Sequence, residues 1–73
     1  MSVWLVYVSE FTDEREAELE YQAKRLGLRI LAVQVVPECI FKIEGGTREE
    51  LERLEAMFEW IYQVTEEDEE EEE

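Results

Sequence analysis

The sequence contains no histidine, the side chain that most often serves as a general base near neutral pH. Without an imidazole, Ser2 and Ser9 cannot form a serine triad, and Cys39 has no partner that would activate its thiol. The Gly45–Gly46 pair lacks the lysine and the spacing of a phosphate-binding loop. We therefore expect that the chain is not an enzyme and that it needs no cofactor.

Cysteine is almost absent as well, since Cys39 is the only one. A single cysteine excludes an internal disulfide and a CxxC zinc site, and no Asp-rich stretch has the spacing of a calcium loop. Cys39 alternates with Phe41 and Ile43, which places its thiol among apolar neighbours. We expect no metal site and a reducing, cytoplasmic environment.

Long apolar runs are also missing. The longest apolar stretch near the N-terminus, residues 3–8, is too short for a signal peptide or a membrane span. We therefore expect no contact with a membrane.

Basic residues are few, with 7 Lys and Arg against 21 Asp and Glu, and the net charge is −14. Eight of the acids form the run 66–73, but the rest of the chain is acidic too. Such a charge repels nucleic acid and attracts basic protein surfaces. The composition predicts no direct nucleic-acid binding, a protein partner with a basic surface, and a disordered polyglutamate tail over residues 66–73.

Three segments have the composition of strands. Residues 3–8 are β-branched, aromatic or aliphatic throughout, which indicates a strand buried on both faces. Residues 29–36 form a second such segment, which ends at Pro37 because proline cannot donate to a ladder. Residues 39–44 alternate more cleanly and predict a strand with one wetter face.

Two helices are predicted from capping signals and apolar spacing. Thr12 is a candidate N-cap for a helix over residues 13–26, and Gly27 follows its end. Residues 47–50 match a capping box and begin a second helix that we expect to run to about residue 64. Its core stripe would consist of the apolar residues Leu51, Leu54, Phe58 and Ile61.

The predicted order is β-α-β-β-α, within a single domain over residues 1–65. It is similar to the ferredoxin-like split βαβ pattern, β-α-β-β-α-β, with the last strand missing. The expected class is therefore α+β, with both helices on one face of a three-stranded sheet. The resemblance concerns architecture alone and identifies no functional residue.

In the complete pattern the first strand lies between the third and the fourth. Without a fourth strand, residues 2–9 would have an unpaired, apolar edge, of the kind that natural proteins usually protect. We expect this edge to pair with another chain, as a homo-oligomer or by β-augmentation. Alternatively, the chain's own tail segment covers the edge, or the strands pair in another order.

Two helices can cover one face of the sheet, so the other face would remain open. We expect this face to carry the apolar residues Ile30, Ala32, Val36 and Ile40, together with either Trp4, Val6 and Val8 or Val3, Leu5 and Tyr7. Such a surface is more apolar than that of most monomers. The residues taken as candidates for an interaction site are Trp4, Val6, Val8, Ile30, Ala32, Ile40 and Trp60.

Trp60 is a candidate because it would lie about 130° from the core stripe of the second helix, at 100° per residue. An aromatic residue outside the core stripe is either an interface anchor or a ring that wraps around the edge of the helix. Tyr21 lies outside the stripe of the first helix in the same way.

These features predict a small acidic protein-interaction module, a regulator or inhibitor that acts on a basic partner surface. One alternative is an assembly subunit that forms a homo-oligomer through the first strand and the open sheet face. A second alternative is a nucleic-acid mimic that occupies a nucleic-acid-binding groove. Salt should weaken the mimic's binding more than it weakens self-association through apolar surface.

Overall fold

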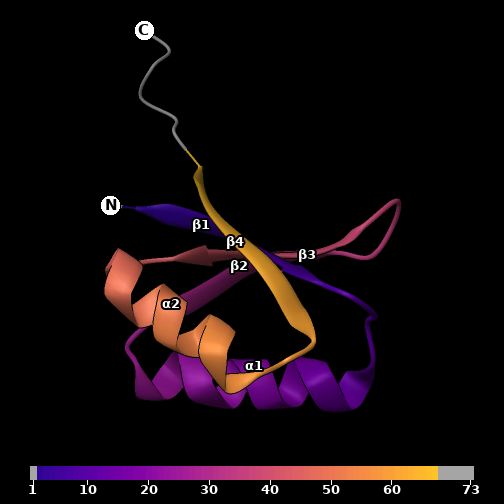
Figure 1. The fold of residues 1–73 in the computed structure, drawn as a ribbon, viewed down its shortest axis with the longest axis horizontal. Coiled ribbons are helices and arrows are strands. Elements are labelled where there is room, and N and C mark those ends of the chain that lie inside the picture. The colour runs from indigo at the N-terminus through magenta and orange to yellow at the C-terminus, as the bar shows by residue number, and fades with distance from the viewer. Residues whose placement is uncertain (1, 68–73) are drawn as a thin grey trace, which may run out of the picture.

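The computed structural model describes residues 2–67, which form four strands and two helices. The elements are β1 (Val3–Val8), α1 (Asp13–Arg25), β2 (Arg29–Gln34), β3 (Cys39–Glu44), α2 (Arg48–Met57) and β4 (Ile61–Glu67). The sheet has the order β2-β3-β1-β4, and every neighbouring pair is antiparallel. Both helices lie on the same side of this sheet (Figure 1). The predicted α+β class is confirmed.

The prediction that the second helix reaches residue 64 is wrong. The α2 helix ends at Met57, Phe58 already has extended backbone angles (φ −124, ψ 119), and β4 begins at Ile61. The segment from Ile61 to Thr65 contains β-branched and aromatic residues that favour a strand. As a strand it also pairs with β1, whose backbone groups would otherwise lack partners on that side.

The fourth strand changes two further predictions. Because β1 pairs with β3 on one side and β4 on the other, pairing of the first strand with another chain is excluded. Because β4 runs to Glu67, Glu66 and Glu67 belong to the sheet and not to a tail. The rest of the predicted tail, residues 68–73, lies outside the described residues.

The helix starts were predicted correctly. The Thr12 hydroxyl accepts a hydrogen bond from the backbone N–H of Arg15 at 3.1 Å. The capping box of α2 is complete, because the Glu50 N–H donates to the Thr47 hydroxyl at 3.3 Å and the Thr47 N–H donates to the Glu50 carboxylate at 3.1 Å. Gly27 follows α1 with a φ of 77°, as expected for a glycine after a helix end.

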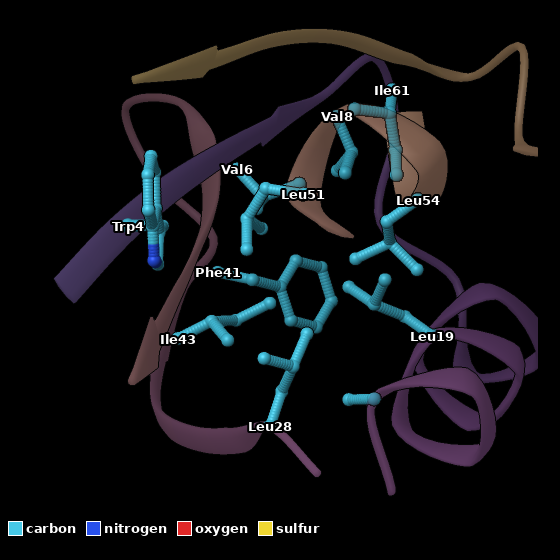
Figure 2. Packing of buried hydrophobic residues seen from close by; sticks show 11 residues of the cluster. Trp4, Val6, Val8, Leu19, Leu28, Phe41, Ile43, Leu51, Leu54 and Ile61 are labelled. Atoms are coloured by element: carbon cyan, nitrogen blue, oxygen red, sulfur yellow. The ribbon is translucent and has the colours of Figure 1, made fainter. Parts of the chain in front are cut away.

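The core lies between the sheet and the two helices (Figure 2). Phe41 from β3 is fully buried at its centre and faces Leu19 of α1 and Leu51 of α2. The cluster is completed by the buried residues Trp4, Val6, Val8, Ala23, Leu28, Ile43, Leu54 and Ile61. This packing fixes which side of each strand faces the helices and which side stays open.

Position 46 requires glycine both for its backbone conformation and for the packing around it. Its φ is 77°, and a Cβ added there would overlap the Leu28 side chain. We expect Gly46→Ala to lower the free energy of unfolding by about 2 to 3 kcal/mol, from left-handed strain plus overpacking. Gly27→Ala is the matched control, because Gly27 has the same φ and open space around it, and it should cost only about 1 kcal/mol. Urea unfolding would measure both; equal losses would contradict the packing at Gly46.

Candidate interaction surfaces

Three of the predicted interaction residues lie in the core. Trp4, Val6 and Val8 point toward the helices and are 2%, 0% and 2% exposed. Their predicted place on the open face is therefore wrong. Both alternating sets of β1 are apolar, so alternation could not choose between them. The pairing of β1 with β3 determines which set faces the helices, because Trp4 pairs with Ile43 and Val6 pairs with Phe41, and both partners lie on the helix side.

The remaining predicted strand residues divide between the two faces. Ile30 pairs with Ile43 and packs against the core, so its predicted exposure on the open face is also wrong. Ala32 pairs with Lys42, and Ile40 pairs with Tyr7, so both lie on the open face as predicted.

Trp60 lies in the turn between α2 and β4, so the helical-wheel interpretation does not apply to it. Its ring stacks on Phe58 with a centroid distance of 4.6 Å, and the Arg15 guanidinium lies 5.3 Å from the ring centroid. It is partly buried and packs against the core. Trp60 therefore makes contacts within the chain, and its ring is not free to anchor a partner protein.

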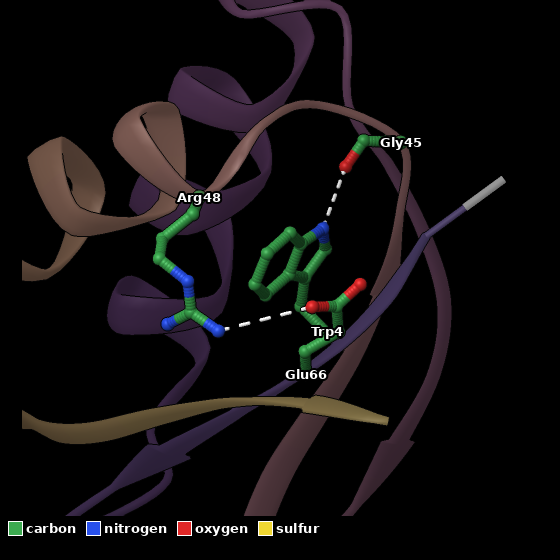
Figure 3. Close-up of polar contacts among 4 residues, drawn as sticks. All are labelled: Trp4, Gly45, Arg48 and Glu66. Atoms are coloured by element: carbon green, nitrogen blue, oxygen red, sulfur yellow. Dashed lines mark hydrogen bonds and ion pairs between the residues drawn. The ribbon is translucent and has the colours of Figure 1, made fainter. Parts of the chain in front are cut away.

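Trp4 joins several parts of the fold at one end of the sheet (Figure 3). Its indole N–H donates a hydrogen bond of 2.9 Å to the Gly45 carbonyl. The Arg48 guanidinium lies 5.4 Å from the ring centroid and forms an ion pair of 3.8 Å with Glu66 of β4. These contacts connect β1, the loop before α2 and the end of β4. The role of Trp4 is therefore structural.

The side of the sheet away from the helices is called here the open face. Its accessible apolar residues are Leu5, Tyr7, Ala32, Ile40 and Tyr62. Its charged residues occur as two pairs, Arg29 with Glu44 at 4.0 Å and Lys42 with Glu67 at 3.6 Å. The open face is thus apolar in part and close to neutral.

The solvent-facing side of α1 and α2, called here the helix layer, has the opposite character. The two helices contain nine acidic and five basic residues. The ion pairs found between residues 2 and 67 use Glu44, Glu66 and Glu67, all from strands, so none uses an acid of a helix. Among the described residues the helices therefore carry a net charge of −4 and the strands −1, while Glu10, Glu38 and Glu59 in the loops add −3.

The helix layer also contains a shallow hollow of about 410 Å³. It is lined by Ala17, Glu18, Tyr21, Gln22 and Phe58. Tyr21 is 62% exposed, and the Arg25 guanidinium lies 6.0 Å from its ring centroid. The sequence indicated Tyr21 only by its position off the core stripe of α1.

Other site types find no support in the described residues. Among residues 2–67, no group of three or more Cys, Asp and Glu side chains is placed to hold a metal ion. None of the described helices combines the length and the apolar character needed to cross a membrane. Comparison with protein-family models, curated proteins and solved structures finds no match to this chain.

Proposed function

We propose that this chain is a small acidic protein-interaction module whose helix layer binds a basic surface of a partner protein. The distribution of charge carries the proposal. Acids on the strands are paired with Arg or Lys, whereas those on the helices are not, within residues 2–67. A one-sided negative field steers a basic partner toward the helices and raises its association rate.

Steering alone does not hold a complex, so the surface also needs an apolar anchor. Interfaces typically combine a few aromatic anchors with a charged rim. Tyr21 and Phe58 line the hollow of the helix layer, with the Glu18 carboxylate beside them. An exposed tyrosine provides a large contact area, and few of its torsions must be fixed on binding. We assign the anchor role to Tyr21 and a regulatory or inhibitory role to the complex.

The fold assignment belongs to the same proposal. We infer that the domain is a complete ferredoxin-like fold, because its elements follow one another as β-α-β-β-α-β and β1 lies between β3 and β4. Such a fold places both helices in one layer, which gives the acids of α1 and α2 a common surface. We also propose that the protein is cytoplasmic, as expected from its sequence.

The experiment is capture of binding proteins from an extract on the immobilised full chain, followed by titration of each identified partner. For a partner of the helix layer, Tyr21→Ala should weaken binding at least about tenfold. Affinity should also fall as salt rises, because exposed charges are screened. Tyr62→Ala is the matched control, since Tyr62 is 53% exposed on the opposite side of the domain and should leave the affinity unchanged.

Two further measurements separate the alternatives. A chain in which the acids of residues 68–73 are replaced by amides tests whether the terminal run, and not the helix layer, attracts the partner. If this variant binds nothing while Tyr21→Ala binds normally, the helix-layer proposal is wrong. If the partner releases bound nucleic acid when the chain is added, the interaction is nucleic-acid mimicry.

A further inference from the structure

Two copies of this chain repel each other, because each carries −14, and the repulsion is weakest when they meet at a surface with little net charge. The open face is such a surface. Its four charged residues are already joined as Arg29–Glu44 and Lys42–Glu67. The unpaired acids of α1 and α2 lie on the other side of the sheet and would point outward from a pair of stacked sheets. We propose that the open face binds the open face of a second copy in a two-fold homodimer.

The shape of the open face fits such a dimer because it has both a protruding ring and a hollow. Tyr62 of β4 leans against Tyr7 with a centroid distance of 6.2 Å and remains 53% exposed. On the other side of β1 lies a hollow of about 350 Å³, lined by Leu5, Ala32, Val33, Gln34, Ile40, Lys42 and Glu67. A two-fold axis along β1 would carry the Tyr62 ring of each copy to the hollow of the other. Reciprocal contacts of this kind are the mark of a closed, isologous interface.

The hollow also contains an acceptor that lacks a donor. The Oε1 atom of Glu67 is buried and has no hydrogen-bond partner within the described part of the chain, although the Lys42 ammonium lies 3.6 Å away. A buried acceptor without a partner costs free energy. The phenol of Tyr62 from a second copy brings an O–H donor into the hollow that this oxygen lines.

Face-to-face packing suits the chain better than pairing of sheet edges. The two edge strands of the sheet are β2 and β4. The ladder of β2 is irregular between Ile30 and Ala32, and such bulges hinder the addition of another strand. The end of β4 carries Glu66 and Glu67, and charged side chains at a sheet edge disfavour the addition of another strand. The open face remains as the surface for self-association.

The test is sedimentation equilibrium of the full chain over a wide range of concentration. We expect a monomer–dimer equilibrium, with a dissociation constant that stays level or falls as salt rises, because salt screens the repulsion between the copies. Tyr62→Ala should raise the dissociation constant at least about tenfold. Tyr21→Ala, on the helix layer, should leave it unchanged.

A second variant tests the hollow independently of the ring. Ala32→Glu adds a bulky charge to the lining of the hollow at an exposed position, and it should also raise the dissociation constant at least about tenfold. Circular dichroism would confirm that both variants keep the wild-type fold. A chain that is monomeric at every concentration overturns the dimer, and so does a dimer that neither Tyr62→Ala nor Ala32→Glu weakens. Neither result bears on partner binding by the helix layer.

Discussion

Replacing Phe41 by alanine should lower the free energy of unfolding by about 3 to 5 kcal/mol, the range for truncating a buried aromatic residue. Phe41 is fully buried, and residues from both helices and from β1 pack around it. A domain of this size has a total stability of roughly 4 to 11 kcal/mol at the usual value per residue. The variant should therefore lose much of its stability, which urea unfolding followed by circular dichroism would measure.

Ile40→Ala is the control for this prediction. Ile40 is the neighbouring residue on β3, but it faces the open side and keeps part of its surface in water. Its truncation should cost only about 1 kcal/mol when measured at a concentration at which the chain is monomeric. Equal losses for the two variants would show that the two faces of β3 have been assigned wrongly.

Replacing Trp4 by alanine should cost a similar amount, about 3 to 5 kcal/mol. The indole ring is 2% exposed and packs in the core, and its N–H bonds the Gly45 carbonyl at 2.9 Å. The substitution would remove the buried ring, leave that carbonyl without its donor and deprive the Arg48 guanidinium of the ring beside it. Urea unfolding followed by Trp60 fluorescence provides the measurement, since Trp60 is the only other tryptophan.

Trp4→Phe separates the ring from its hydrogen bond. This variant keeps most of the aromatic packing but loses the N–H donor, so it should cost about 1 to 2 kcal/mol. A Trp4→Phe protein as stable as wild type would mean that the bond to Gly45 contributes nothing. A Trp4→Phe protein as unstable as Trp4→Ala would mean that the bond, and not the packing, accounts for the whole effect.

The sequence predicted those parts of the fold that depend on neighbouring residues. Thr12 and Thr47 begin helices because each hydroxyl accepts a bond from an N–H three residues ahead, and such motifs are visible in the sequence. The end of α2 was not predicted, because Leu51, Leu54, Phe58 and Ile61 also fit one continuous helical stripe. The helix ends early because Ile61–Glu67 pairs with β1 as a strand. These two segments are far apart in the sequence, so the pairing cannot be recognised from neighbouring residues.

The same limit applies to the interaction surfaces. Ile40 was placed on the open face correctly, because the alternation of β3 is polar on one side. Ile30 and Ala32 were predicted on the same face, but the irregularity between them places only Ala32 on the open face. Trp4, Val6 and Val8 were placed wrongly because nothing polar marks either side of β1. Tyr62 was missed altogether, since it was assigned to a helix. Its exposure is set by an irregularity in the pairing of β4 with β1 near Tyr7 and Val8, which has no sequence signature.

The position of β1 between β3 and β4 has a consequence for the order of events during synthesis. β1 leaves the ribosome first, yet its two neighbours are the third and the fourth strands along the chain. Until Glu67 has emerged, a nascent chain exposes an apolar strand with one side unpaired, and such edges are prone to associate wrongly. The sheet is therefore complete only after the last strand of the domain has left the ribosome.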